Sequence, residues 1–144
     1  MRSRTADDER RRRWAHSVHR VYRKQIQYHV GSPLPAIDGN RQIKLPSPDM
    51  YEGSSDVEIF DAWLLSLLRW MVVSGYCGPD YDKFRVSLVG VYLKGKAIEW
   101  YNDEVVGIHR AKLEWTFEET ILGLFDRCVQ AATVHQATQK FEEI

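Results

Sequence analysis

The side chains that could bind a metal or attack a substrate are few in this chain, and they are scattered along it. His16 and His19 stand three positions apart and would share one helix face, but a metal site needs a third ligand and none is near in the sequence. Cys77 lies in a glycine-containing loop, with His109 as its only plausible base. We expect solvated histidines and an ordinary loop thiol, with Cys128 as a small core residue.

Carboxylates are abundant, but most of them lie at helix starts. A negative charge there complements the helix dipole and the free backbone N–H groups. These carboxylates include Asp80, Asp82, Glu99, Asp103, Glu104, Glu114, Glu118 and Glu119. The sequence has neither a phosphate-binding glycine loop nor a zinc knuckle of cysteine and histidine. These patterns predict a protein that is not an enzyme and that uses no metal or cofactor.

The composition is typical of one globular domain. The chain has 144 residues, of which 44% are hydrophobic and 12% aromatic, so it is long and apolar enough to bury a core. No apolar run approaches the ~18 residues of a membrane-spanning helix. Because two cysteines cannot form a disulfide framework, we expect an intracellular, cytoplasmic protein.

Charge is balanced overall but is unevenly distributed along the chain. Residues 1–30 hold nine Arg and Lys against three acids, and the remainder is correspondingly acidic. The neutral total argues against a uniformly basic nucleic-acid-binding protein. The basic residues of this segment are still candidate RNA contacts, with a solvated helix face as the simpler interpretation. They are Arg10, Arg11, Arg12, Arg13, Arg20, Arg23 and Lys24.

The basic segment is predicted to be a helix over 7–30. Apolar residues recur in it at intervals of three and four, interrupted by the polar Gln25, so they lie on one face. That face is a candidate for self-association and consists of Trp14, Val18, Val21 and Tyr28. Residues 1–30 are therefore interpreted as a basic amphipathic arm.

Residues 31–55 are interpreted as a linker or extended arm because they are rich in proline and glycine. Asp38-Gly39-Asn40 is a candidate hairpin turn. Met50 and Tyr51 are candidates to anchor this arm to the body of the protein.

Residues 56–130 are expected to form the body, an all-α compact bundle of about four to five helices. A capping box over Ser55–Glu58 opens the first helix, whose apolar stripe runs from Val57 to Met71 before Gly75 ends it. Pro79-Asp80 opens the second, Lys96 to Val106 is the third, and a capping box over Thr116–Glu119 opens the fourth.

The inward residues of the later helices follow from the same spacing. The second helix is expected to bury Phe84, Leu88, Val91 and Tyr92, with Gly95 near its end. The fourth is expected to bury Phe117, Ile121, Leu124, Phe125 and Cys128. Residues 131–144 are expected to begin a further helix.

Four short motifs in order over 45–125 resemble the Gag capsid domain of gypsy-type LTR retrotransposons. Pro48 to Gly53 is similar to that family's P-x-x-F-x-G entry, with Tyr51 where Phe is usual, and Trp63-Leu64 is similar to its W-L helix. Leu93 to Trp100 reads L-x-G-x-A-x-x-W, and Trp115 to Leu124-Phe125 is similar to its last helix. The residues that carry the resemblance are Tyr51, Gly53, Trp63, Leu64, Gly95, Ala97, Trp100, Trp115, Phe117 and Phe125.

The resemblance implies the N-terminal lobe of a capsid protein, a helical unit that associates with its own copies into virus-like particles around RNA. Residues 131–144 would then begin a C-terminal lobe, and the chain would be a truncated or domesticated Gag. Two other functions remain open. One is an adaptor derived from Gag that binds an extended peptide near residues 46–72, and the other is an RNA-binding module that uses residues 1–30.

Overall fold

The computed structural model describes residues 2–33 and 46–131, and it confirms the prediction of an all-α fold. Within these ranges the regular elements are all helical, and the candidate turn at 38–40 and the expected helix over 131–144 lie outside them, except for residue 131. The helices are α1 (Arg2–Val30), α2 (Val57–Val73), the short 3₁₀ helix η1 (Pro79–Tyr81), α3 (Asp82–Val91), α4 (Gly95–Glu104), α5 (Phe117–Phe125) and the π-helical turn η2 (Asp126–Gln130).

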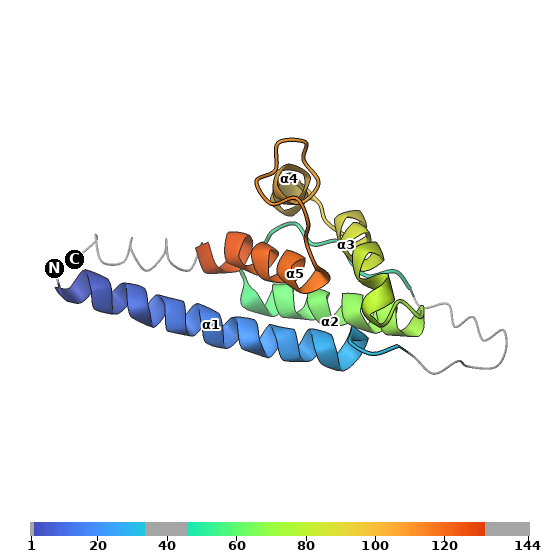
Figure 1. Ribbon diagram of the computed structural model, residues 1–144, viewed down its shortest axis with the longest axis horizontal. Coiled ribbons are helices and arrows are strands. Elements are labelled where there is room, and N and C mark those ends of the chain that lie inside the picture. Colours follow the sequence, from blue (N-terminus) through green and yellow to red (C-terminus); the bar gives the residue numbers. More distant parts are fainter. Residues whose placement is uncertain (1, 34–45, 132–144) are drawn as a thin grey trace.

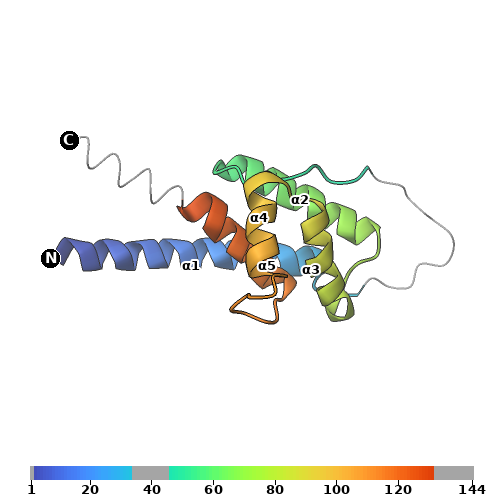
Figure 2. The ribbon, with the colours of Figure 1, turned by 90° about the horizontal axis from the view of Figure 1, so that it is seen from above.

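The second half of α1, α2 and α5 pack side by side, with α3 at one end and α4 crossing α5 (Figures 1 and 2). In both views the first half of α1 extends beyond α2. The centre of the core is aromatic, because the Phe125 ring lies 5.0 Å from that of Tyr22 and 5.6 Å from that of Phe60. The helix α1 is therefore part of the core over its second half and is not a separate arm.

The face of α1 that packs inward is a different one from the face for which the sequence predicts self-association, and that prediction stays untested. Tyr22, Ile26 and Val30 are buried, whereas Val21 is 63% exposed and Tyr28 is 86% exposed. The helix carries two apolar stripes about 100° apart, and the spacing analysis followed the outer one. Of the predicted stripe, only Val18 and Trp14 touch the core, Trp14 through the Phe125 ring at 6.2 Å.

The helix α2 buries the stripe that the sequence predicts, including Phe60, Trp63 and Leu64. Its N-cap is Asp56, whose carboxylate accepts the Glu58 N–H at 2.9 Å, so the predicted cap at Ser55 was one residue early. Gly75 follows the helix with φ +82°, as expected for a glycine stop.

The inward face of α3 also differs from the prediction. Of the four residues expected inside, Leu88 and Tyr92 are partly buried against the core, but Phe84 is 45% exposed and Val91 is 60% exposed. Arg85 and Val89 are buried instead. Arg85 faces inward because its guanidinium donates hydrogen bonds to the carbonyl of Tyr76 at 3.1 Å and to that of Gly78 at 2.7 Å. Because these bonds bring Arg85 inside, the buried face of α3 is shifted by one residue from the face that the sequence predicts.

The helix α5 agrees with the sequence in both its cap and its buried face. Glu119 N–H donates to Thr116 Oγ at 3.1 Å, and Thr116 N–H donates to Glu119 Oε1 at 3.0 Å, which completes the predicted capping box. The five residues expected to be buried are buried: Phe117, Ile121, Leu124, Phe125 and Cys128. Gly95 opens α4 instead of ending α3.

Candidate binding groove

Two of the four motifs meet in space, although a whole pair of helices separates them in the sequence. The backbone of Tyr51 forms a parallel bridge with Leu93. Tyr51 N–H donates to the Tyr92 carbonyl at 2.9 Å, and Lys94 N–H donates to the Tyr51 carbonyl at 2.9 Å. Ala97 N–H reaches the Glu52 carbonyl at 3.3 Å. The segment 49–53 is thereby fixed to the start of α4.

Glycine makes this approach possible at two positions. Gly53 has φ +98°, and a methyl group there would lie 3.1 Å from the Ala97 nitrogen. Gly95 has φ +56°, and a methyl group there would lie 3.1 Å from the Glu52 carbonyl oxygen. At both positions the backbone is left-handed and a neighbouring backbone atom is close, so the local geometry requires glycine.

Tyr51 anchors the segment, as the sequence predicts. Its ring is buried and stacks on Trp63 with centroids 5.2 Å apart, and its hydroxyl donates to the Ser54 carbonyl at 2.5 Å. Burial raises the pKa of the Tyr51 hydroxyl far above its ordinary range. Met50, the other predicted anchor, is exposed instead.

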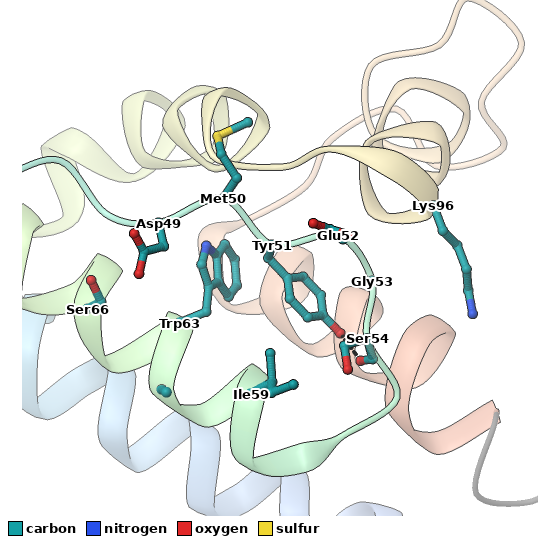
Figure 3. A pocket seen from close by; sticks show the side chains of 11 residues that line it. Asp49, Met50, Tyr51, Glu52, Gly53, Ser54, Ile59, Trp63, Ser66 and Lys96 are labelled. Carbon is teal, nitrogen blue, oxygen red and sulfur yellow. Dashed lines mark hydrogen bonds between the residues drawn. The ribbon is translucent and has the colours of Figure 1, made fainter.

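A groove with a volume of about 670 Å³ lies between segment 49–54 and α2 (Figure 3). We call it the Tyr51–Trp63 groove. In Figure 3 the Trp63 ring stands between the side chains of Asp49 and Tyr51, with Ile59 beside it on α2. Its lining comprises Asp49, Met50, Tyr51, Glu52, Gly53, Ser54, Ile59, Ala62, Trp63, Ser66 and Lys96.

The groove contains hydrogen-bonding groups without partners among the described residues. Trp63 is only 4% exposed, and its Nε1 is a buried donor with no acceptor there. Consecutive N–H groups of an extended chain point to opposite edges. Tyr51 uses one edge, whereas the N–H groups of Met50 and Glu52 bond to no group in the described part of the chain. Unsatisfied donors beside an apolar wall favour a polar, extended ligand.

A second, shallower groove of about 460 Å³ runs between α1 and α2. Tyr22 and Asp61 close its floor through a bond in which the Tyr22 hydroxyl donates to the Asp61 carboxylate at 2.5 Å. Burial and this carboxylate raise the pKa of Tyr22 far above its usual range. Val21 and Val57 form its exposed apolar rim, and Ala62 lines both grooves.

The remaining motif residues hold the body together. Trp63, Leu64, Ala97, Phe117 and Phe125 are buried in the core.

Trp100 and Trp115 are only partly buried and meet edge-to-face with centroids 5.7 Å apart. Both rings pack against the core from outside. The sequence analysis missed Gly123, where a methyl group would lie 2.8 Å from the Trp100 ring.

The candidate RNA contacts are exposed along α1. Arg10, Arg12, Arg20, Arg23 and Lys24 form no ion pair with the described residues, while Arg13 lies 3.8 Å from Glu9. The side chain of Arg11 lies outside the described residues. These side chains remain available for phosphate contacts.

The histidines and cysteines are placed differently from one another. His16 is exposed as expected, but His19 Nε2 lies 2.6 Å from Asp126 Oδ1 and joins α1 to η2. Cys77 and Cys128 are buried free thiols, and burial raises the pKa of each. His109 is exposed in a loop. In the described residues, no three His, Cys, Asp or Glu side chains group as metal ligands.

Comparison with known proteins found no relative. No family model matches the chain, and neither does any curated protein or solved structure. Over the described residues, no helix is long and apolar enough to cross a membrane.

Proposed function

We propose that this chain is a non-enzymatic binding lobe that takes an extended peptide in the Tyr51–Trp63 groove. The observation that carries the proposal is the pair of N–H groups of Met50 and Glu52, which bond to no group in the described residues, on a segment that lines the Tyr51–Trp63 groove. A peptide that lies along this segment adds a strand to an open edge. Its carbonyl oxygens then satisfy donors that are otherwise without partners.

The expected affinity follows from these contacts. Each backbone hydrogen bond contributes about 0.5–1.5 kcal/mol, and burying one large apolar side chain contributes about 1.5–3 kcal/mol. Ile59 and Met50 are exposed beside the groove and offer the apolar surface for that side chain. Association and ordering of the peptide oppose these gains, so binding in the micromolar range is expected.

The proposal is consistent with a lobe of the Gag capsid type. The packing of the motif residues supports it. Backbone hydrogen bonds join segment 51–53 to the residues around Gly95 and Ala97. Only small residues allow the two segments to come this close. Their role here is to hold the segment that forms one wall of the groove. This arrangement gives the motif a structural purpose without any catalytic residue.

Self-assembly of the Gag type is the second candidate function. The observation that favours it is the apolar rim of the α1–α2 groove, where Val21 is 63% exposed and Val57 is 44% exposed. Exposed apolar patches of this kind mark surfaces that contact other proteins. Particle assembly uses weak repeated contacts, each smaller than a permanent dimer interface.

A selection from a library of random decapeptides displayed on phage tests the main proposal. Selected peptides are titrated into the isotopically labelled full chain, and backbone amide signals are followed by NMR. We expect the largest changes at Met50, Glu52 and the Trp63 indole N–H. Selected peptides that shift signals on α3 or α4 instead, or a selection that yields no binder, would contradict it.

A further inference from the structure

The outward surface of α2 carries a symmetric pattern of charge and size. Glu58, Ala62, Leu65 and Arg69 are spaced by four, three and four residues, so they form one stripe, which we call the α2 seam. Glu58, Ala62 and Arg69 are exposed, and Leu65 is half-buried. Neither Glu58 nor Arg69 forms an ion pair within the described part of the chain.

The order of these residues is self-complementary when the helix meets an antiparallel copy of itself. The stripe reads acidic, small, large, basic, and its spacing is the same in both directions. A two-fold axis between Ala62 and Leu65 therefore places Glu58 opposite Arg69 of the partner subunit, and Ala62 opposite Leu65 of the partner subunit. The axis repeats each contact, so the ion pair and the size match each occur twice.

We infer that the α2 seam is an interface with a second copy of this chain, paired antiparallel about that axis. Small residues opposite large ones let the helices interdigitate as knobs into holes. A parallel pair would put Glu58 against Glu58 of the partner subunit, and such like-charge contacts disfavour that arrangement. The charges thus specify one orientation and the Ala62–Leu65 contacts supply the packing.

The surroundings of the seam suit a second helix. It lies on the solvent side of α2, between the Tyr51–Trp63 groove and the α1–α2 groove. Ile59 is 50% exposed and Val57 is 44% exposed, so apolar surface borders the seam. The nearby Asp61 is already bonded to Tyr22. One helix per copy buries less than the ~1,200 Å² of a standard interface, so the dimer is weak.

Sedimentation velocity of the full chain tests the pairing. The wild-type chain should form dimers as its concentration rises from micromolar to millimolar. Glu58→Lys alone and Arg69→Glu alone each replace two attractive pairs with two repulsive ones, and each should weaken dimerisation about tenfold or more. Low salt makes this difference largest.

The decisive sample is an equal mixture of the two variants. Each contact between a Glu58→Lys chain and an Arg69→Glu chain joins opposite charges again, so the mixture should dimerise as well as the wild type. Asp103→Lys, the same charge change on the exposed side of α4, is the matched control and should dimerise normally. A monomeric wild type, or a mixture no better than its components, would overturn the inference.

The pairing does not rest on peptide binding. Glu58 and Arg69 do not line the Tyr51–Trp63 groove, so the two charge variants should bind the selected peptides as the wild type does. Dimerisation without peptide binding, or the reverse, separates the two proposals.

Discussion

Tyr51 and Leu93 lie side by side in a parallel bridge, although α2 and α3 come between them in the chain. Through this bridge the segment before α2 is held at the start of α4, and one wall of the groove is made. The bridge uses both the N–H and the carbonyl of Tyr51, whereas the N–H groups of Met50 and Glu52 bond to no group in the described residues.

Substitution of Gly53 by alanine should destabilise the protein by about 1–3 kcal/mol, because φ is +98° and the methyl group meets the backbone of Ala97. Gly75→Ala is the matched control. Its φ is +82°, but no atom lies within 4 Å, so only the backbone cost of about 1 kcal/mol applies. Urea unfolding measures both. Equal losses would mean that the contact between Gly53 and Ala97 is not tight.

Trp100→Ala should cost about 2 kcal/mol, which is less than the ~3–5 kcal/mol expected for Phe125→Ala. Trp100 lies partly exposed against Trp115, whereas Phe125 is fully buried among rings from α1 and α2. Thermal or urea unfolding of the two variants gives the comparison. If Trp100→Ala lowered the free energy of unfolding as much as Phe125→Ala, Trp100 would have to belong to the core.

The buried face of a helix was predicted correctly where the sequence of that helix has only one apolar stripe. The helices α2 and α5 each carry one apolar stripe, and the glycine after α2 and the capping box of α5 fell at the expected positions. In α1 a second stripe through Val21 and Tyr28 competed with the buried one. In α3 one of the two buried residues is Arg85, which hydrophobic spacing cannot identify.

The candidate site was predictable only in part. The composition of 31–55 indicated an arm, and Tyr51 was recognised as its anchor from its residue type. The pairing of Tyr51 with Leu93 depends on a contact between distant segments, which no local pattern encodes. The missing partner of Trp63 Nε1 is likewise a property of the packed molecule.

Stability should fall as the pH rises above about 9. Burial raises the pKa of the Cys128 thiol above its ordinary value of 9.0, so the thiol stays protonated in the folded protein while it ionises in the unfolded chain. The stabilisation is therefore complete below that pH and declines above it. Urea midpoints from about pH 8 to about pH 10 measure the decline. It should be smaller in Cys128→Ala, and an unchanged decline would exclude this thiol as a source.

The RNA-binding hypothesis predicts that affinity for RNA depends steeply on salt and on the arginines in the first half of α1, which extends beyond α2. Removing residues 1–30 is no test, because Tyr22, Ile26 and Val30 belong to the core. Arg10→Ala, Arg12→Ala and Arg13→Ala combined leave the core intact and should lower the slope of log affinity against log salt by about 2–3 for single-stranded RNA. Filter binding at several salt concentrations measures the slope, and an unchanged slope would remove this surface from consideration.

The affinity of Trp63→Phe for a selected peptide tests the central claim most directly. The variant keeps an aromatic ring but removes part of the wall of the groove, so it should fold and yet bind the peptide about 5–10-fold more weakly. Trp115→Phe, whose Nε1 bonds to the Lys112 carbonyl away from the groove, is the matched control and should bind normally. Isothermal titration calorimetry gives both affinities. Equal binding by wild-type protein and Trp63→Phe would contradict the claim that the peptide lies in the Tyr51–Trp63 groove.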